Sequence, residues 1–171
     1  MSASHPKVRS IRVLLVDDHA MIRQGLRCAL ECYRNIEVVG EAGDGEQALE
    51  CVAKVQPTVV VMDMIMPIMD GITATRLIKT QYPQIAVVGL TREPKDYTLY
   101  SMKKVGAFEV VDKANAVVEL YQAIQRAIAD IKATTADRPE IASGTGFKPE
   151  AIDKSPDYPT YPHLPTQLPA A

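Results

Sequence analysis

Three aspartates follow apolar segments of the chain and could together bind a cation. Asp63 closes the apolar run at residues 58–62, and the pair Asp17 and Asp18 closes the run at residues 13–16. Apolar runs of this length predict strands that are buried on both faces, as in a parallel sheet. Because ligands bind at the carboxyl edge of such sheets, we expect the three carboxylates to converge there.

Carboxylates that converge in this way need a compensating charge. At a separation of about 4 Å and an effective dielectric constant near 20, each pair repels by roughly 4 kcal/mol. Either a retained proton or a cation must offset this repulsion. Oxygen ligands of this kind suit a hard divalent ion, so the sequence predicts a divalent-cation site at this edge of the sheet.

The elements that would position these carboxylates alternate regularly between strands and helices. Apolar runs predict the five strands, at residues 11–16, 36–41, 58–62, 85–90 and 108–111, and an amphipathic segment follows each run. Such repeats fold with right-handed crossovers into an α/β domain, a parallel sheet with helices on both faces. The last helix is expected to follow the cap residue Asn115 and to bury one apolar stripe, made by Val117, Leu120, Tyr121, Ile124, Ile128 and Ile131.

Composition narrows the classes of function. The chain has 171 residues and a net charge of −2, without a basic stripe, which argues against direct binding of DNA. No apolar run is long enough to span a membrane. The odd number of cysteines, Cys28, Cys32 and Cys51, predicts reduced thiols and a cytoplasmic protein. Cys28 and Cys32 would share a helix face, but a metal site there lacks further ligands.

The chain is expected to divide into three parts: an N-terminal extension at residues 1–10, a domain at residues 11–131, and a proline-rich flexible tail at residues 132–171. So many prolines cannot form the packed helices of a DNA-reading domain. Within the tail, Pro156, Pro159, Pro162 and Pro165 recur every third residue. This spacing suits a polyproline II edge that docks on a partner or on the domain, with a disordered extension as the alternative.

Four motifs together resemble the receiver domain of bacterial response regulators. They are the pair Asp17 and Asp18, Asp63, Thr91 and Lys113. The pair follows the first predicted strand, and the other three follow the third, fourth and fifth strands. The resemblance covers about residues 11–131. It is greatest to the subfamily that usually carries a helix-turn-helix output domain, which we do not expect in this chain. The resemblance implies a flavodoxin-like sheet in the strand order 2-1-3-4-5.

The resemblance also implies a role for each motif. Asp63 would accept a phosphoryl group from a sensor histidine kinase or a phosphotransfer protein. Mg²⁺ would be held by Asp17, Asp18, Asp63 and the backbone carbonyl of Ile65. Lys113 and Thr91 would contact the phosphoryl oxygens. The chain would catalyse nothing beyond its own phosphorylation and dephosphorylation. It would signal to a downstream protein, or form a homodimer, through residues 96–105, residues 108–111 and the last helix.

Several residues depart from the family pattern and keep alternatives open. Arg92 replaces a small residue, Val110 replaces an aromatic ring that moves on activation, and Ala114 replaces a proline that follows a cis bond. A cis bond before alanine costs roughly 3 kcal/mol, so we expect a trans bond or a strained site there. With these changes, a phosphorylation-independent interaction or dimerisation module remains the alternative function.

The residues near Asp63 also bear on an alternative enzyme class and an alternative metal ligand. A phosphotransferase of the haloacid dehalogenase type needs a second aspartate at the position of Ile65, which nearly excludes that class.

Because Ile65 is apolar and cannot orient an attacking water, we expect a long-lived phosphorylated form. Glu93 matches a second position that tunes this hydrolysis. His19, beside the acidic pair, is a less favoured metal ligand, since it begins the first helix.

Overall fold

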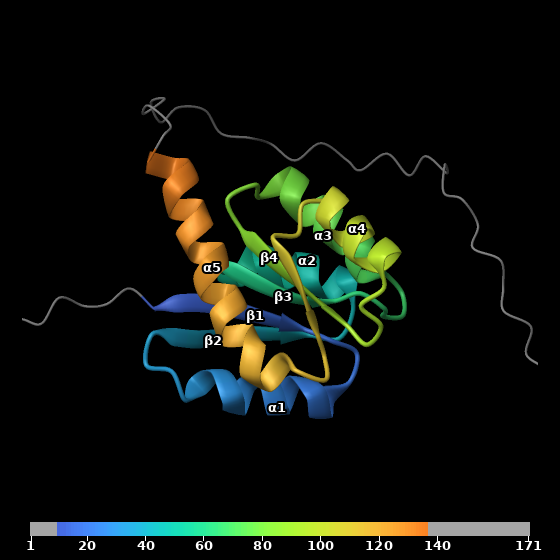
Figure 1. Cartoon of the computed structure of the whole chain (residues 1–171), viewed down its shortest axis with the longest axis horizontal. Helices are drawn as coiled ribbons and strands as arrows, with labels where there is room; N and C mark the ends of the chain where they lie inside the picture. Colours follow the sequence, from blue (N-terminus) through green and yellow to red (C-terminus); the bar gives the residue numbers. More distant parts are fainter. Residues whose placement is uncertain (1–9, 137–171) are drawn as a thin grey trace, which may run out of the picture. The chain divides into compact units, whose positions relative to one another are not determined.

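Five strands and five helices alternate through residues 10–136, the part of the chain that the computed structural model describes (Figure 1). The strands are β1 (Ile11–Val16), β2 (Ile36–Ala42), β3 (Val59–Asp63), β4 (Ala86–Thr91) and β5 (Glu109–Asp112). The helices are α1 (Ala20–Glu31), α2 (Gly45–Val55), α3 (Gly71–Gln81), α4 (Asp96–Lys104) and α5 (Ala116–Ala136). All ten predicted elements are present, with small differences at their ends.

The strands form one parallel sheet in the order β2-β1-β3-β4-β5. This confirms the predicted α/β class and the flavodoxin-like order. β1 and β3 are neighbours, and Val16 pairs with Met62. The residues that follow this pair, Asp17 and Asp63, therefore emerge side by side at the carboxyl edge of the sheet. The chain folds in this way because the buried strands are apolar throughout and each helix buries one face.

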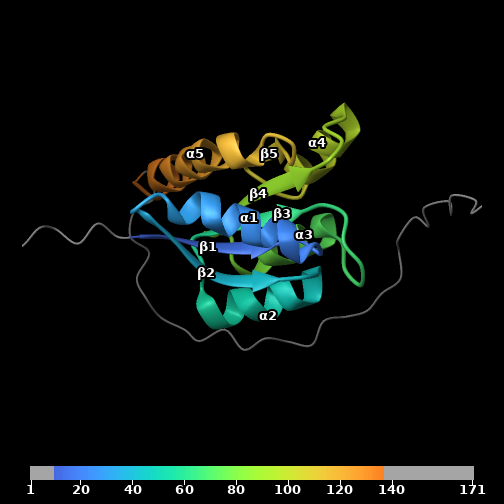
Figure 2. The same cartoon turned by 90° about the horizontal axis from the view of Figure 1, so that it is seen from below.

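Two apolar layers cover the two faces of the sheet (Figures 1 and 2). α1 and α5 pack on one face through residues that include Leu26, Leu30, Leu120 and Ile124. The other face is covered by α2, α3 and α4, through Val52, Ile78 and Met102 among others. Alternate strand residues point to the two layers, Val59 and Val61 to the first, and Val60 and Met62 to the second. Burial on both faces holds the carboxyl edge rigidly in place.

The last helix differs from the prediction in one detail. Val117 was expected in the buried stripe but is 63% exposed. The buried positions are Ala116, Leu120, Ala123, Ile124 and Ala127. This stripe recurs at helical spacing from Ala116, so Val117 lies about 100° away from it around the helix. The predicted stripe was therefore wrong at its first residue.

Two other sequence-based expectations concern the terminal segments of the chain and membrane-spanning helices. Among the described residues, no helix is both long and apolar enough to cross a bilayer. The expectations for residues 1–9 and for the proline-rich tail beyond residue 136 lie outside the described part of the chain. They stay predictions.

Candidate functional site

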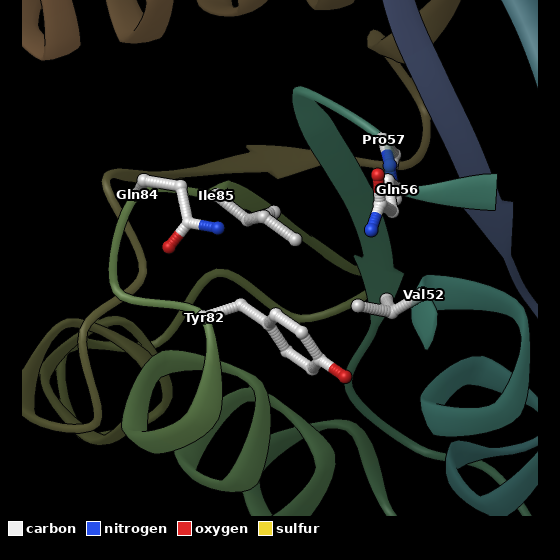
Figure 3. Close-up of a pocket in the computed structure, with 6 residues that line it drawn as sticks. All are labelled: Val52, Gln56, Pro57, Tyr82, Gln84 and Ile85. Atoms are coloured by element: carbon white, nitrogen blue, oxygen red, sulfur yellow. The ribbon is translucent and has the colours of Figure 1, made fainter. Parts of the chain in front are cut away.

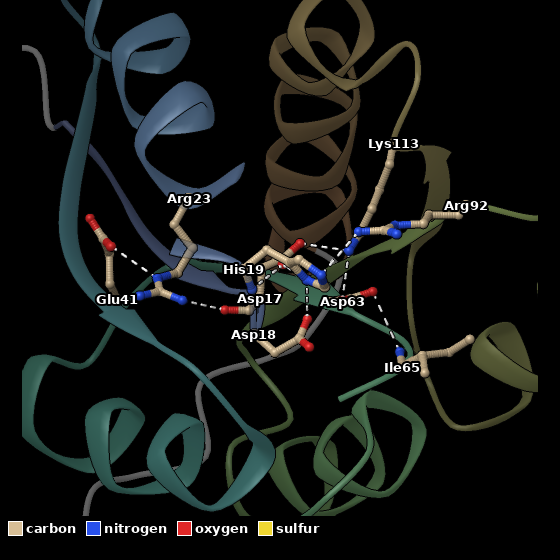
Figure 4. Close-up of polar contacts among 9 residues, drawn as sticks. All are labelled: Asp17, Asp18, His19, Arg23, Glu41, Asp63, Ile65, Arg92 and Lys113. Atoms are coloured by element: carbon tan, nitrogen blue, oxygen red, sulfur yellow. Dashed lines mark hydrogen bonds and ion pairs between the residues drawn. The ribbon is translucent and has the colours of Figure 1, made fainter. Parts of the chain in front are cut away.

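Asp17 and Asp63 both pair with one cationic side chain, Lys113, at the carboxyl edge of the sheet (Figure 4). The Lys113 ammonium lies 2.7 Å from Asp17 Oδ2 and 2.7 Å from Asp63 Oδ2. Both aspartates are buried, with 1% and 4% of their surfaces exposed. Ion pairs in such a place are screened little by water, so the lysine offsets much of the carboxylate repulsion. Of the three carboxylates expected to converge, the structure brings Asp17 and Asp63 together around Lys113, while Asp18 pairs with His19.

The turn after β5 aims Lys113 at the carboxylates. The Lys113 N–H donates to the Thr91 carbonyl at 2.7 Å, which ties this turn to the end of β4. The Ala114 N–H donates to Asp112 Oδ1 at 2.9 Å. No cis peptide bond occurs among the described residues, so the bond between Lys113 and Ala114 is trans, the first of the two expected outcomes.

Asp63 sits in a closely packed environment. Burial raises its pKa above the ordinary value of 3.8, while the neighbouring Lys113 acts to lower that pKa and the charge of Asp17 acts to raise it. The Ile65 N–H donates to Asp63 Oδ1 at 3.4 Å. Gly71, at the start of α3, lies so close that a side-chain Cβ there would be 1.8 Å from the Asp63 carbonyl oxygen. The end of β3 therefore requires glycine at this position.

The loop after β1 is ordered around Asp17. Asp17 Oδ1 accepts from the His19 N–H at 2.9 Å, just before α1 begins. Arg23 donates to the Asp17 carbonyl and also pairs with Glu41 at the end of β2, at 3.0 Å. Arg27 pairs with the second oxygen of Glu41 at 2.7 Å, and these arginines lower the pKa of Glu41 against the effect of its burial. Nothing in the sequence motifs pointed to this support.

Asp18 and Thr91 have partners other than Asp63. Asp18 Oδ1 lies 2.6 Å from His19 Nδ1, on the solvent side of the site. The Thr91 hydroxyl is buried and bonds within its own loop, donating to the Glu93 carbonyl at 3.2 Å and accepting from the Glu93 N–H at 3.1 Å. Thr91 thus lies at the same edge as Asp63, one strand away, but its hydroxyl is engaged locally.

The donor set suits a hard divalent cation. Asp17 Oδ2 is buried, and within the described residues only the Lys113 ammonium approaches it as a donor. Asp17, Asp18 and His19 each offer a ligand atom within 4.8 Å of one another. Several carboxylate oxygens close together are the ligands that a partly hydrated Mg²⁺ prefers. The three cysteines are free thiols and belong to no such group among the described residues.

One interaction was missed by sequence reasoning altogether. Arg92, noted only as an unusual cation beside Thr91, places Nη2 at 3.3 Å from His19 Nε2. These residues are 73 positions apart and follow different strands, β1 and β4. No periodicity or motif links such a pair, so only the fold reveals it.

A hollow elsewhere on the domain has no comparable chemistry (Figure 3). Its volume is about 210 Å³, and its lining consists of Val52, Gln56, Pro57, Tyr82, Gln84 and Ile85. Pro57 lies two residues before β3 and Ile85 immediately before β4, so the hollow is at the opposite edge of the sheet from Asp63. None of the six residues is charged.

The sheet order, with two buried aspartates and one lysine at its carboxyl edge, defines a class of signalling domains whose members are phosphoacceptors. The chain belongs to the response regulator receiver domain family of two-component systems, and the family model matches residues 13–125. The resemblance found in the sequence motifs is thereby confirmed.

Known proteins of this family give the same result. The chain is 38% identical over 117 residues to the transcriptional regulatory protein LiaR of Bacillus subtilis, covering 68% of this chain and 56% of LiaR. It is 35% identical to the response regulator VraR of Staphylococcus aureus, with the same coverage. A solved LuxR-family response regulator from Aurantimonas superposes with a TM-score of 0.67 at 31% identity, covering 75% of this chain and 96% of the other. The chain spans about half the length of these curated relatives.

Proposed function

We propose that this chain is a phosphorylatable receiver in a two-component phosphorelay. Asp63 is the phosphoacceptor, and the donor is a phosphohistidine of a sensor kinase or phosphotransfer protein. The observation that carries the proposal is the Lys113 ammonium held between Asp17 and Asp63, at 2.7 Å from each. A buried cation at that point is suited to receive the negative charge that a phosphoryl group brings.

The chemistry asks for positioning more than for proton transfer. An Asp63 oxygen attacks phosphorus, the P–N bond of the phosphohistidine breaks, and its electron pair stays on the departing imidazole, which takes up a proton. Burial raises the pKa of Asp63, and the neighbouring Lys113 acts to lower it and so favours the ionised, nucleophilic form. Lys113 then neutralises one phosphoryl oxygen as a point charge. Thr91 would exchange its local bonds for one to a phosphoryl oxygen.

Mg²⁺ would be held by Asp17, Asp18, Asp63 and the Ile65 carbonyl. When bound, the ion supplies charge neutralisation for the transferring phosphoryl group. The chain's own part is to present these oxygens together at the carboxyl edge of the sheet. The buried Asp17 Oδ2, with no donor but Lys113 in the described part of the chain, supports this assignment.

The signal would pass to a protein partner through α4, β5 and α5. Tyr97 and Tyr100 on α4 are 63% and 65% exposed, whereas Met102 on the same helix is fully buried. Two large exposed aromatic side chains on one helix suit a docking surface. A second copy of the chain is one such partner. We place this activity in the cytoplasm, where free thiols such as Cys28 stay reduced.

A labelling experiment tests the proposal. The full chain is incubated with acetyl phosphate and Mg²⁺, and intact mass is measured before and after hydroxylamine, which cleaves acyl phosphates. One phosphoryl group is expected on the wild type and none on Asp63→Ala. Asp130→Ala, which removes an exposed carboxylate on α5, is the matched control and should label normally. Equal labelling of Asp63→Ala would refute the assignment.

The alternative, a phosphorylation-independent interaction module, has one observation in its favour. Lys113 already offsets part of the charge of Asp17 and Asp63, and Thr91 is satisfied within its own loop, so both have partners without a ligand. The same experiment separates the two functions. A wild-type chain that takes no phosphoryl group and binds no beryllofluoride with Mg²⁺ would favour this alternative.

A further inference from the structure

A chain of polar contacts crosses the open side of the site, from Arg92 through His19 to Asp18 (Figure 4). Arg92 Nη2 lies 3.3 Å from His19 Nε2, and His19 Nδ1 lies 2.6 Å from Asp18 Oδ1. We call this arrangement the Asp18–His19–Arg92 chain. It joins the loop after β1 to the loop after β4, and these two strands are not neighbours in the sheet, because β3 lies between them.

The chemistry of the three groups determines where the imidazole proton lies. A guanidinium has donors only, so His19 Nε2 must accept from Arg92 and carries no proton in this arrangement. The proton is therefore on Nδ1, from which it is donated to the Asp18 carboxylate. An Nδ1 that bears this proton cannot at the same time bind a metal ion. The contact with Arg92 thus argues that His19 competes with a metal ion rather than ligating it.

We propose that His19 and Arg92 are positioning residues that compete with the divalent cation for Asp18. A metal ion that takes Asp18 Oδ1 displaces the hydrogen bond from His19 Nδ1, and Arg92 holds His19 in the orientation that makes this bond. Metal binding at Asp18 is thereby linked to the contact between His19 and Arg92. This inference rests on the proposed function, because it needs Asp18 to be a metal ligand.

The linkage has a definite sign. Removing His19 or Arg92 leaves Asp18 without its competing partner, so affinity for Mg²⁺ rises. His19 is half exposed and the contacts are solvated, so the effect is modest, about threefold in dissociation constant. Because the two residues act through one chain, their effects do not add. A residue acting only through its charge would give additive effects instead.

Isothermal titration of Mg²⁺ into the full chain tests the proposal. We expect His19→Ala and Arg92→Ala each to tighten binding by about threefold, and the double variant to bind no tighter than the stronger single variant. Arg126→Ala, which removes an exposed arginine paired with Glu109 away from the site, is the control and should leave Mg²⁺ affinity unchanged. Additive effects would overturn the shared chain. Weaker binding by His19→Ala would overturn it in favour of His19 as a metal ligand.

Nitrogen NMR gives a second readout that does not depend on activity. In the metal-free chain, His19 should show its proton on Nδ1 and not on Nε2. Addition of Mg²⁺ should remove the hydrogen bond that Nδ1 donates to Asp18 and so shift the Nδ1 resonance. A His19 resonance that is identical with and without bound Mg²⁺ would overturn the competition. If the wild type binds no Mg²⁺ at all, the proposed function itself fails, which is a different result from unchanged variant affinities.

Discussion

At the scale of single residues, Asp63 combines a functional role with an energetic cost. Its carboxylate is buried between a like charge, Asp17, and one ammonium, Lys113. Because burial raises the pKa of Asp63 in the folded state, the ionised form is less favourable in the folded than in the unfolded chain. The contribution of Asp63 to stability is thus full below pH 3.8, its ordinary pKa, and is lost as the pH rises through the folded-state pKa.

This reasoning predicts the effect of Asp63→Asn. Without Mg²⁺ at pH 7, the variant should be more stable than the wild type, by about 0.5–2 kcal/mol in free energy of unfolding. The advantage should shrink as the pH falls below 3.8, where Asp63 becomes protonated in both states. Saturating Mg²⁺ should stabilise the wild type more than the variant, because ligand binding to the folded state adds stability. Urea unfolding across pH measures this, with Asp130→Asn as control.

A less stable Asp63→Asn at neutral pH would show that the pair with Lys113 outweighs burial. In that case, stability would increase with ionisation of Asp63 instead of decreasing. The two outcomes differ in sign, so the experiment does not depend on the size of the pKa change.

Ile65 carries a second prediction at this scale. Its side chain is 79% exposed beside Asp63, where an apolar group cannot orient an attacking water. Ile65→Asn should shorten the life of the phosphorylated chain by roughly tenfold, less than a fully positioned general base would contribute. Phosphate release after acetyl phosphate treatment measures this lifetime. Ile68→Asn, equally exposed in the same loop, should leave it unchanged. An unaltered half-life in Ile65→Asn contradicts the prediction.

At the scale of elements, close contact between β3 and α3 positions Asp63, the proposed phosphoacceptor. A Cβ at Gly71 would meet the Asp63 carbonyl at 1.8 Å, whereas the Gly71 N–H donates to the Met64 carbonyl at 3.0 Å. The turn between these elements is therefore held by backbone contact, and the site depends on a residue that has no side chain.

Gly71→Ala should accordingly lower the free energy of unfolding by about 1–3 kcal/mol through overpacking. Gly25→Ala is a matched control, because a Cβ there has nothing within 4 Å and lies in the middle of α1. In that helix alanine should stabilise by about 0.4–1 kcal/mol. Urea unfolding of both variants measures the contrast. Equal effects of the same sign would show that the backbone at Gly71 yields more easily than its contacts indicate.

At the scale of the whole molecule, the exposed aromatic side chains of α4 form the proposed docking surface for a partner. A homodimer formed on phosphorylation would bury Tyr97 and Tyr100. The double variant Tyr97→Ser, Tyr100→Ser should weaken dimerisation by at least about tenfold, since aromatic residues dominate interface energies. Light scattering in beryllofluoride and Mg²⁺ measures it, and Met21→Ser, exposed on α1, is the control. A wild type that stays monomeric under these conditions would exclude the homodimer.

Much of the fold follows from sequence pattern alone. Fully apolar strands and amphipathic helices alternate strictly, so the parallel sheet and its two helical layers could be predicted. The grouping of charged residues at the carboxyl edge was also predictable, because all residues that directly follow parallel strands lie at the same edge of the sheet. The first residue of the last buried stripe, Val117, was not predictable, since several apolar residues at neighbouring positions allow more than one register.

The sequence by itself determined which charged residues meet, because strand order and strand ends bring Asp17, Asp63 and Lys113 to one edge. Only the tertiary structure decided how they pair: the lysine bridges two aspartates, and Asp18 pairs with His19 and through it with Arg92. The reason is one of length scale. Periodicity specifies faces and edges of elements, whereas a hydrogen bond needs two groups within about 3 Å, which depends on the packing of the whole domain.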